Sequence, residues 1–142
     1  MNRYVALFTA ANVVLTIAVA ALAELLKLKS GSGLAVAAAL GASFFAAAAF
    51  ARDHSRPPTS EERGAFAWRA LLSTWVVSLV LAAMLLAFLV EPAELRALYR
   101  TLMSATALTI AAGAMLFVSA IYYVAIRWSF GWYAKLAAGQ RA

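Results

Sequence analysis

Charged residues are scarce in this sequence. Only 13% of its 142 residues are Asp, Glu, Lys or Arg, whereas 65% are hydrophobic. A soluble domain has about 25% charged and about 45–50% apolar residues. The shortage of charge excludes both an ordinary water-soluble domain and a disordered chain. We expect residues 1–142 to form one domain, because the apolar segments leave little chain for a second.

Cysteine is absent, and His54 is the single histidine. Without cysteine, the chain has no disulfide, no thiol catalysis and no thiolate metal site. A zinc site needs about four ligands, and no second group of His, Asp or Glu is clustered near His54. The sequence also has no paired nucleophile and base and no phosphate-binding glycine loop. It therefore predicts a protein that is not an enzyme and that has neither a metal nor a cofactor.

Four long stretches contain no charge at all. They run over 4–23, 30–51, 70–90 and 101–126, with lengths of 20, 22, 21 and 26 residues. A helix of roughly 20 apolar residues crosses a bilayer, and the long continuous apolar runs exclude the alternating pattern of β-barrel strands. We expect an all-α membrane protein with four transmembrane helices in an up-and-down bundle. The expected spans are 4–25, 33–51, 66–90 and 101–126.

The first span also has features of a signal peptide. Arg3 precedes the apolar run, and Ala21-Leu22-Ala23 offers a small-residue cleavage site. Against cleavage, the run is longer than a usual signal sequence, and Asn12 and Thr16 interrupt it. We expect a retained helix, but the sequence leaves both outcomes open.

The basic residues are unequally divided between the two sides of the expected bundle. The chain ends and the central connection through Arg69 carry eight Lys or Arg residues, and the other two connections carry four. Lys and Arg accumulate on the cytoplasmic side of membrane proteins. We therefore expect both termini and a loop over 52–65 in the cytoplasm. The net charge of +6 then needs no nucleic-acid partner to explain it.

The C-terminal residues 127–142 combine aromatic and basic side chains. Trp128, Trp132 and Tyr133 lie close to Lys135 in the sequence. Amphipathic rings beside basic residues are typical of the membrane–water interface. One interpretation is an interfacial tail, and the other is a frayed helix end.

The loop between the second and third spans is the most polar stretch. Pro57 and Pro58 predict the end of the second helix. Thr59 followed by Glu62 has the spacing of a capping box, so a third helix should begin directly after Thr59. Capping leaves Arg56 unexplained, and a docking surface for a cytoplasmic protein or lipid headgroups is the alternative interpretation.

A family of small, uncharacterised bacterial four-helix inner-membrane proteins has an R-x-P-T-x-x-E signature in its central loop. This sequence resembles it in the run Arg56-Pro57-Pro58-Thr59-Ser60-Glu61-Glu62. It is similar to that family also in Ser30-Gly31-Ser32-Gly33 and in Phe130-Gly131-Trp132. The resemblance implies four helices in a bacterial plasma membrane. It implies no catalytic or binding residue.

Few polar residues interrupt the expected spans. Thr9, Asn12 and Thr16 lie on one face of the first helix, and we expect Asn12 to hydrogen-bond to another helix. Thr109 and Gly113 belong to a stripe of small residues that favours close helix packing. The candidate interaction or packing residues are Asn12, Thr16, Arg56, Thr59, Glu62, Arg69, Thr109 and Gly113.

Two functions remain open on these grounds. The first is a non-enzymatic integral membrane protein that associates with proteins, lipids or further copies of itself. The alternative is a small transporter or channel working as an oligomer, with Asn12, Thr16 and Thr109 along a polar path. No ionisable residue lies deep in a span, where proton-coupled transporters usually have one. The two hypotheses differ in whether the polar residues surround one cavity.

Overall fold

The computed structural model describes residues 1–27 and 32–139, so Lys29, Ser30, Gly31 and Arg141 lie outside the described residues. The chain is 90% helical, and these two ranges contain no strand. The helices are α1 (Asn2–Leu25), α2 (Ser32–His54), α3 (Ser60–Leu89), α4 (Pro92–Leu102) and α5 (Ala105–Gly139).

Four of these helices are long and apolar enough to cross a membrane. The qualifying segments are Asn2–Ala23, Val36–His54, Ser60–Phe88 and Ala105–Ala137. The expectation of an all-α fold with four membrane-spanning candidates is therefore confirmed at this level.

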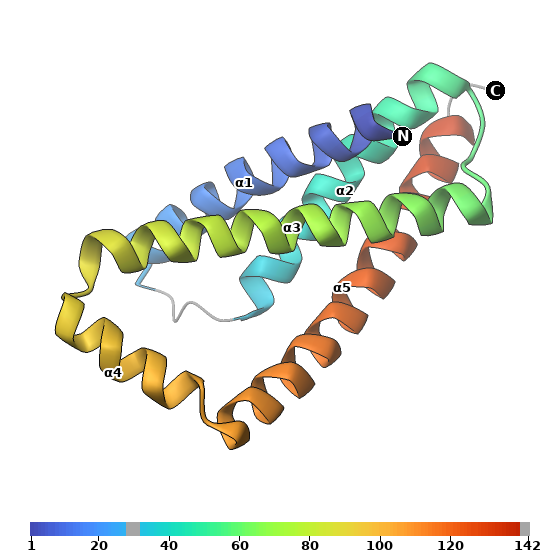
Figure 1. Ribbon diagram of the computed structural model, residues 1–142. Helices are drawn as coiled ribbons and strands as arrows, with labels where there is room; N and C mark the ends of the chain where they lie inside the picture. Colours follow the sequence, from blue (N-terminus) through green and yellow to red (C-terminus); the bar gives the residue numbers. More distant parts are fainter. Residues whose placement is uncertain (28–31, 140–142) are drawn as a thin grey trace.

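The four long helices form a bundle in which each has two neighbours. α1 packs against α2 and α3, and α5 packs against the same two helices from the other side. The N-terminus, the connection between α2 and α3, and the C-terminal end of α5 lie near one another (Figure 1). We call this the loop end of the bundle, defined by residues 1–5 and 52–63.

Four phenylalanines form the centre of the core, one from each long helix. Phe8, Phe50, Phe66 and Phe130 are at most 1% exposed. The rings of Phe66 and Phe130 stack with centroids 4.0 Å apart, and Phe8 meets Phe66 edge-on at 5.8 Å. Contacts of this geometry add to the stabilisation from apolar burial. The core therefore joins all four helices near the loop end.

The alanine-rich helix α2 is the most buried of the four. Ala38, Ala42 and Ala46, at successive turns, are at most 2% exposed. Because alanine side chains are so short, neighbouring helices approach α2 closely. The alanines lower the mean hydropathy of α2, and they also allow this helix to pack closely within the bundle.

Beyond the core, α3 and α5 diverge, and α4 connects their far ends (Figure 1). We call residues 76–89 and 105–118 the two arms. Large apolar side chains on the arms are exposed, including Val76, Leu79, Val80, Leu81, Met84, Phe88, Leu108, Ile110, Leu116 and Phe117. In a bilayer, lipid or another protein would cover these surfaces.

Two elements differ from the sequence-based expectation. Residues Pro92–Leu102 form the additional helix α4, and α5 begins at Ala105 and continues to Gly139, whereas we expected a span over 101–126 and a separate tail. Ser129, Phe130 and Ala134 are fully buried. The described part of the tail, 127–139, is therefore regular helix packed within the bundle, because its apolar and small residues continue the core-facing side of α5.

Candidate functional site

The connection between α2 and α3 reverses the chain within a few residues. The backbone N–H of Ser55 donates to the carbonyl of Ala51 at 2.9 Å, and Ser55 has φ +50°. This left-handed residue ends α2 in the manner of a C-terminal cap. Pro58 is buried, and Thr59 then takes an extended conformation before α3.

Thr59 and Glu62 form the expected capping box. The Glu62 N–H donates to Thr59 Oγ1 at 3.2 Å, and the Thr59 N–H donates to Glu62 Oε2 at 2.8 Å. Two backbone donors that would lack helical partners are thereby satisfied. The prediction that the third helix begins directly after Thr59 is confirmed.

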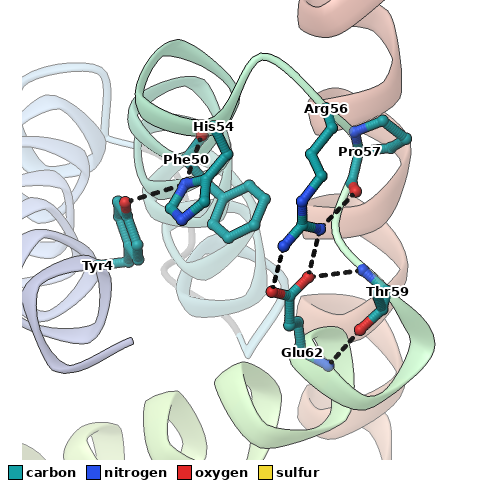
Figure 2. A network of polar contacts seen from close by, with 7 residues as sticks. All are labelled: Tyr4, Phe50, His54, Arg56, Pro57, Thr59 and Glu62. Carbon is teal, nitrogen blue, oxygen red and sulfur yellow. Dashed lines mark hydrogen bonds and ion pairs between the residues drawn. The ribbon is translucent and has the colours of Figure 1, made fainter.

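Arg56 binds the same glutamate. Its Nη1 donates to Glu62 Oε2 at 2.9 Å, and its Nη2 donates to Oε1 at 2.8 Å (Figure 2). These hydrogen bonds raise the pKa of Arg56 above its ordinary value, so the side chain stays charged. The guanidinium carbon also lies 5.6 Å from the centroid of the Phe50 ring. Arg56, which capping left unexplained, therefore links the end of α2 to the first turn of α3.

A second group of polar contacts joins the start of α1 to the end of α2. Asp53 Oδ2 accepts hydrogen bonds from Arg3 Nη1 and from the Tyr4 hydroxyl, both at 3.0 Å. The Tyr4 hydroxyl also lies 3.3 Å from His54 Nδ1, and the His54 ring stacks on Phe50 at 4.3 Å (Figure 2). His54 thus has a packing role, and the described residues contain no cluster of three metal-binding side chains around it.

α3 and α5 are held together at the same end by arginines. Arg127 donates to the hydroxyls of Ser60, at 3.1 Å, and Tyr123, at 3.3 Å. Arg63 lies directly against Gly131, where an added Cβ would be 2.5 Å from Arg63 Cδ. The Arg63 Nε is buried and has no hydrogen-bond partner in the described structure. Gly131 therefore provides the space that the Arg63 side chain occupies.

The polar candidates within the spans do not come together. Thr9 donates to Ser73 of α3 at 2.9 Å, whereas Thr16 is exposed. Asn12 is only 8% exposed, as expected for a side chain that faces other helices. The described residues provide no hydrogen bond to its amide group, so the expected interhelical bond is absent there.

The remaining candidates lie on exposed surfaces. Thr109 donates to the Ala105 carbonyl of its own helix at 2.9 Å, and an added Cβ on Gly113 would have no neighbour within 4 Å. The stripe of small residues on α5 thus packs against no other helix of the described chain. Arg69 donates to Asn2 Oδ1 at 2.9 Å, which places it at the loop end.

A groove lies between α1 and α2, and the sequence did not predict it. It has a volume of about 590 Å³ and is lined by Leu7, Ala10, Ala11, Val14, Leu15, Phe45, Ala48, Ala49 and Arg52. The apolar residues have helical spacing, which in the sequence is indistinguishable from a surface that faces lipid. Only the pairing of α1 with α2 turns the two faces into one groove.

Comparison with known proteins adds no functional assignment. No family model, no curated protein and no solved structure matches this chain. The candidate sites are therefore interpreted from their geometry and chemistry.

Proposed function

We propose that this chain is a multi-pass protein of a bacterial plasma (inner) membrane and acts by association with other proteins or lipids, without catalysing a reaction. The observation that carries the proposal is the pair of diverging arms on α3 and α5. Their large apolar side chains, such as Leu79 and Phe117, are 63% and 69% exposed. These exposed apolar side chains on the arms offer a surface to another membrane helix or to lipid.

The proposal includes an orientation with both termini in the cytoplasm. The loop end carries Arg3, Arg52, Arg56 and Arg63, and the excess of basic residues favours the cytoplasmic side. The resemblance to the bacterial four-helix family remains part of the same proposal. In its favour, the Arg, Thr and Glu of the signature act here as one structural unit, because Arg56 and Thr59 both bind Glu62.

The pairing of polar groups favours association over transport. Thr9 bonds to Ser73 between α1 and α3, and Trp75 Nε1 donates to Ser119 Oγ at 3.0 Å between α3 and α5. These are separate contacts between neighbouring helices. A polar path would instead require the side chains of Asn12, Thr16 and Thr109 to face one cavity, and Thr16 and Thr109 are exposed.

The cysteine-free chain allows a direct test of orientation. Single cysteines at Ser55 and Ser104 stand before and after the α3–α4 segment, and both positions are exposed. In intact spheroplasts, an impermeant maleimide should label Ser104→Cys, whereas Ser55→Cys should react only after permeabilisation. The reverse pattern would overturn the proposed orientation.

Association is tested by cross-linking from the arms in native membranes. Leu79→Cys and Phe117→Cys should cross-link to one defined protein through a short bifunctional reagent, whereas Leu98→Cys on α4 serves as the control. Once the cross-linked protein is identified, deletion of its gene should abolish the cross-link. Restoring the gene should recover it. Substrate flux through liposomes containing only this protein, without any arm-specific cross-link, would favour the transporter alternative.

A further inference from the structure

The groove between α1 and α2 has an apolar lining that comes from one face of each helix. Leu7, Ala10, Ala11 and Val14 line it from α1, and Phe45, Ala48, Ala49 and Arg52 line it from α2. Each set follows the spacing i, i+3, i+4, i+7, which is one face of a helix. The two faces together extend for about 10 Å along the helices, since a helix rises about 1.5 Å per residue.

The small and large residues of the groove have different positions along each helix face. Alanines occupy the middle of both sets, and Leu7, Val14 and Phe45 stand at their ends. The alanines leave the space between the helices unfilled, while the larger side chains border it. Because eight of its nine lining residues are apolar, the groove suits a saturated or unsaturated acyl chain.

Arg52 gives the groove a polar end. It lies one residue before Asp53, which binds Arg3 and Tyr4 at the start of α1. Arg52 is therefore at the loop end, and the apolar residues extend from it toward the middle of the helices. A site with a cation at the membrane surface and an apolar groove below it matches the charged headgroup and the acyl chain of a phospholipid.

The charge at this end favours an anionic occupant. Arg52 is exposed and forms no ion pair or side-chain hydrogen bond within the described structure, whereas the neighbouring Asp53 is engaged by Arg3. Guanidinium groups bind phosphate oxygens through two parallel hydrogen bonds. A second copy of this chain is itself positively charged, with a net charge of +6 over its whole length, so an anionic lipid complements Arg52 better.

We propose that the α1–α2 groove binds an anionic phospholipid, with one acyl chain along the alanines and the phosphate on Arg52. The inference rests on the proposed membrane location. It deepens the proposed association by naming one lipid site. It does not depend on a protein partner for the arms.

The test uses the full-length protein in mild detergent and native mass spectrometry. Phosphatidylglycerol and phosphatidylcholine with identical acyl chains are added separately, and the fraction of lipid-bound protein is measured over a concentration series. Phosphatidylglycerol should be retained about fivefold more tightly, as expected for one basic residue that meets an anionic headgroup. Equal retention of the two lipids would overturn the proposal.

Two variants separate the headgroup from the acyl chain. Arg52→Gln should lower phosphatidylglycerol retention to the level of phosphatidylcholine, and Ala48→Leu should fill the groove and lower the retention of both lipids. Arg96→Gln and Ala112→Leu, at exposed positions on α4 and α5, are the matched controls. If the controls lower retention as much as the groove variants do, the binding is nonspecific and the groove is not the site.

Further measurements distinguish other occupants. Circular dichroism and thermal unfolding of each variant establish that the fold is retained. Glycerol phosphate, which has the anion but no acyl chain, should not displace the lipid, and full displacement would show an anion site alone. A disulfide between two copies of Ala11→Cys in membranes would place a second copy in the groove and overturn the lipid assignment. The cross-linking test of the arms is independent of these measurements, so failure of the lipid site does not decide the proposed association.

Discussion

The guanidinium of Arg56 forms two hydrogen bonds with the carboxylate of Glu62, at 2.9 Å and 2.8 Å. The same carboxylate accepts the Thr59 backbone N–H, which closes the capping box of α3. The Glu62 side chain therefore binds both the residue that caps α3, Thr59, and the loop residue that follows α2, Arg56. The polar loop is thereby an ordered structural connection.

Thr59→Ala should destabilise the first turn of α3 by about 1 kcal/mol, because the Glu62 N–H loses its side-chain acceptor. Hydrogen exchange of residues 60–64 in detergent measures the change as a loss of protection. Thr109→Ala is the control, since the Thr109 hydroxyl bonds only to its own helix. Unaltered protection at 60–64 would show that the cap contributes no stability.

Ser55→Gly should stabilise the protein by up to about 1 kcal/mol. Ser55 has φ +50°, and a left-handed conformation costs a residue with a Cβ roughly 1–2 kcal/mol, partly offset by the greater freedom of glycine when unfolded. Unfolding in sodium dodecyl sulfate gives the midpoint for each variant. Ala65→Gly, inside α3, should shift the midpoint in the opposite direction. A lower midpoint for Ser55→Gly would contradict the capping role of this residue.

Thr9 and Ser73 should show coupled contributions to stability. Their hydroxyls lie 2.9 Å apart between α1 and α3, and interhelical hydrogen bonds in membrane proteins contribute about 0.6 kcal/mol on average. A double-mutant cycle with Thr9→Val and Ser73→Ala measures the coupling energy. Thr74→Ala, whose hydroxyl bonds only to the Ala70 carbonyl, replaces Ser73→Ala in the control cycle. Equal coupling in both cycles would exclude a specific Thr9–Ser73 interaction.

Alanine should have different effects at two glycines of α5. Gly113→Ala should stabilise the helix by about 0.5–1 kcal/mol, because its Cβ would enter open space. Gly131→Ala should lose this gain, since its Cβ would meet Arg63 Cδ at 2.5 Å. Thermal unfolding compares the two variants. Shortening the neighbour with Arg63→Ala should restore the gain at Gly131, and failure to do so would show that Arg63 is not the obstacle.

Asn12→Leu should leave stability unchanged or increase it. The Asn12 side chain is 8% exposed and has no hydrogen bond to the described residues, so leucine removes a buried polar group without removing a bond. This reverses the expectation drawn from the sequence, in which Asn12 bonds to another helix. Detergent unfolding measures the effect, and Thr9→Val serves as the destabilising comparison. A clear loss of stability in Asn12→Leu would indicate that its amide has a partner in the membrane.

Local signals in the sequence account for much of the secondary structure. Thr59 and Glu62 stand three residues apart, so their capping box was predictable without knowledge of the fold. The helix α4 could also have been found from Pro92 at its start, Glu94 in its first turn and Arg100 in its last turn. These signals act within one or two turns of helix, which is why a sequence displays them.

The candidate sites depended on contacts between distant segments. Glu62 was predicted as a capping residue, but its bonds with Arg56 required the loop to fold back on itself. The small stripe at Gly113 was predicted to pack and is exposed, because α5 diverges from α3 along that stretch. Phe130 was expected in an interfacial tail or a frayed helix end, and it packs on Phe66 in the core.

The sequence by itself determined that this chain forms four long apolar helices and where the third one starts. Hydrophobic length and capping are properties of consecutive residues, and the surrounding fold changes them little. Only the tertiary structure decided which helix faces meet, where the aromatic core lies and that α1 and α2 enclose a groove ending at Arg52. Nearly every face of these helices is apolar, so their hydrophobicity does not select partners. The fit of alanines, phenylalanines and a few hydrogen bonds across helices makes that selection.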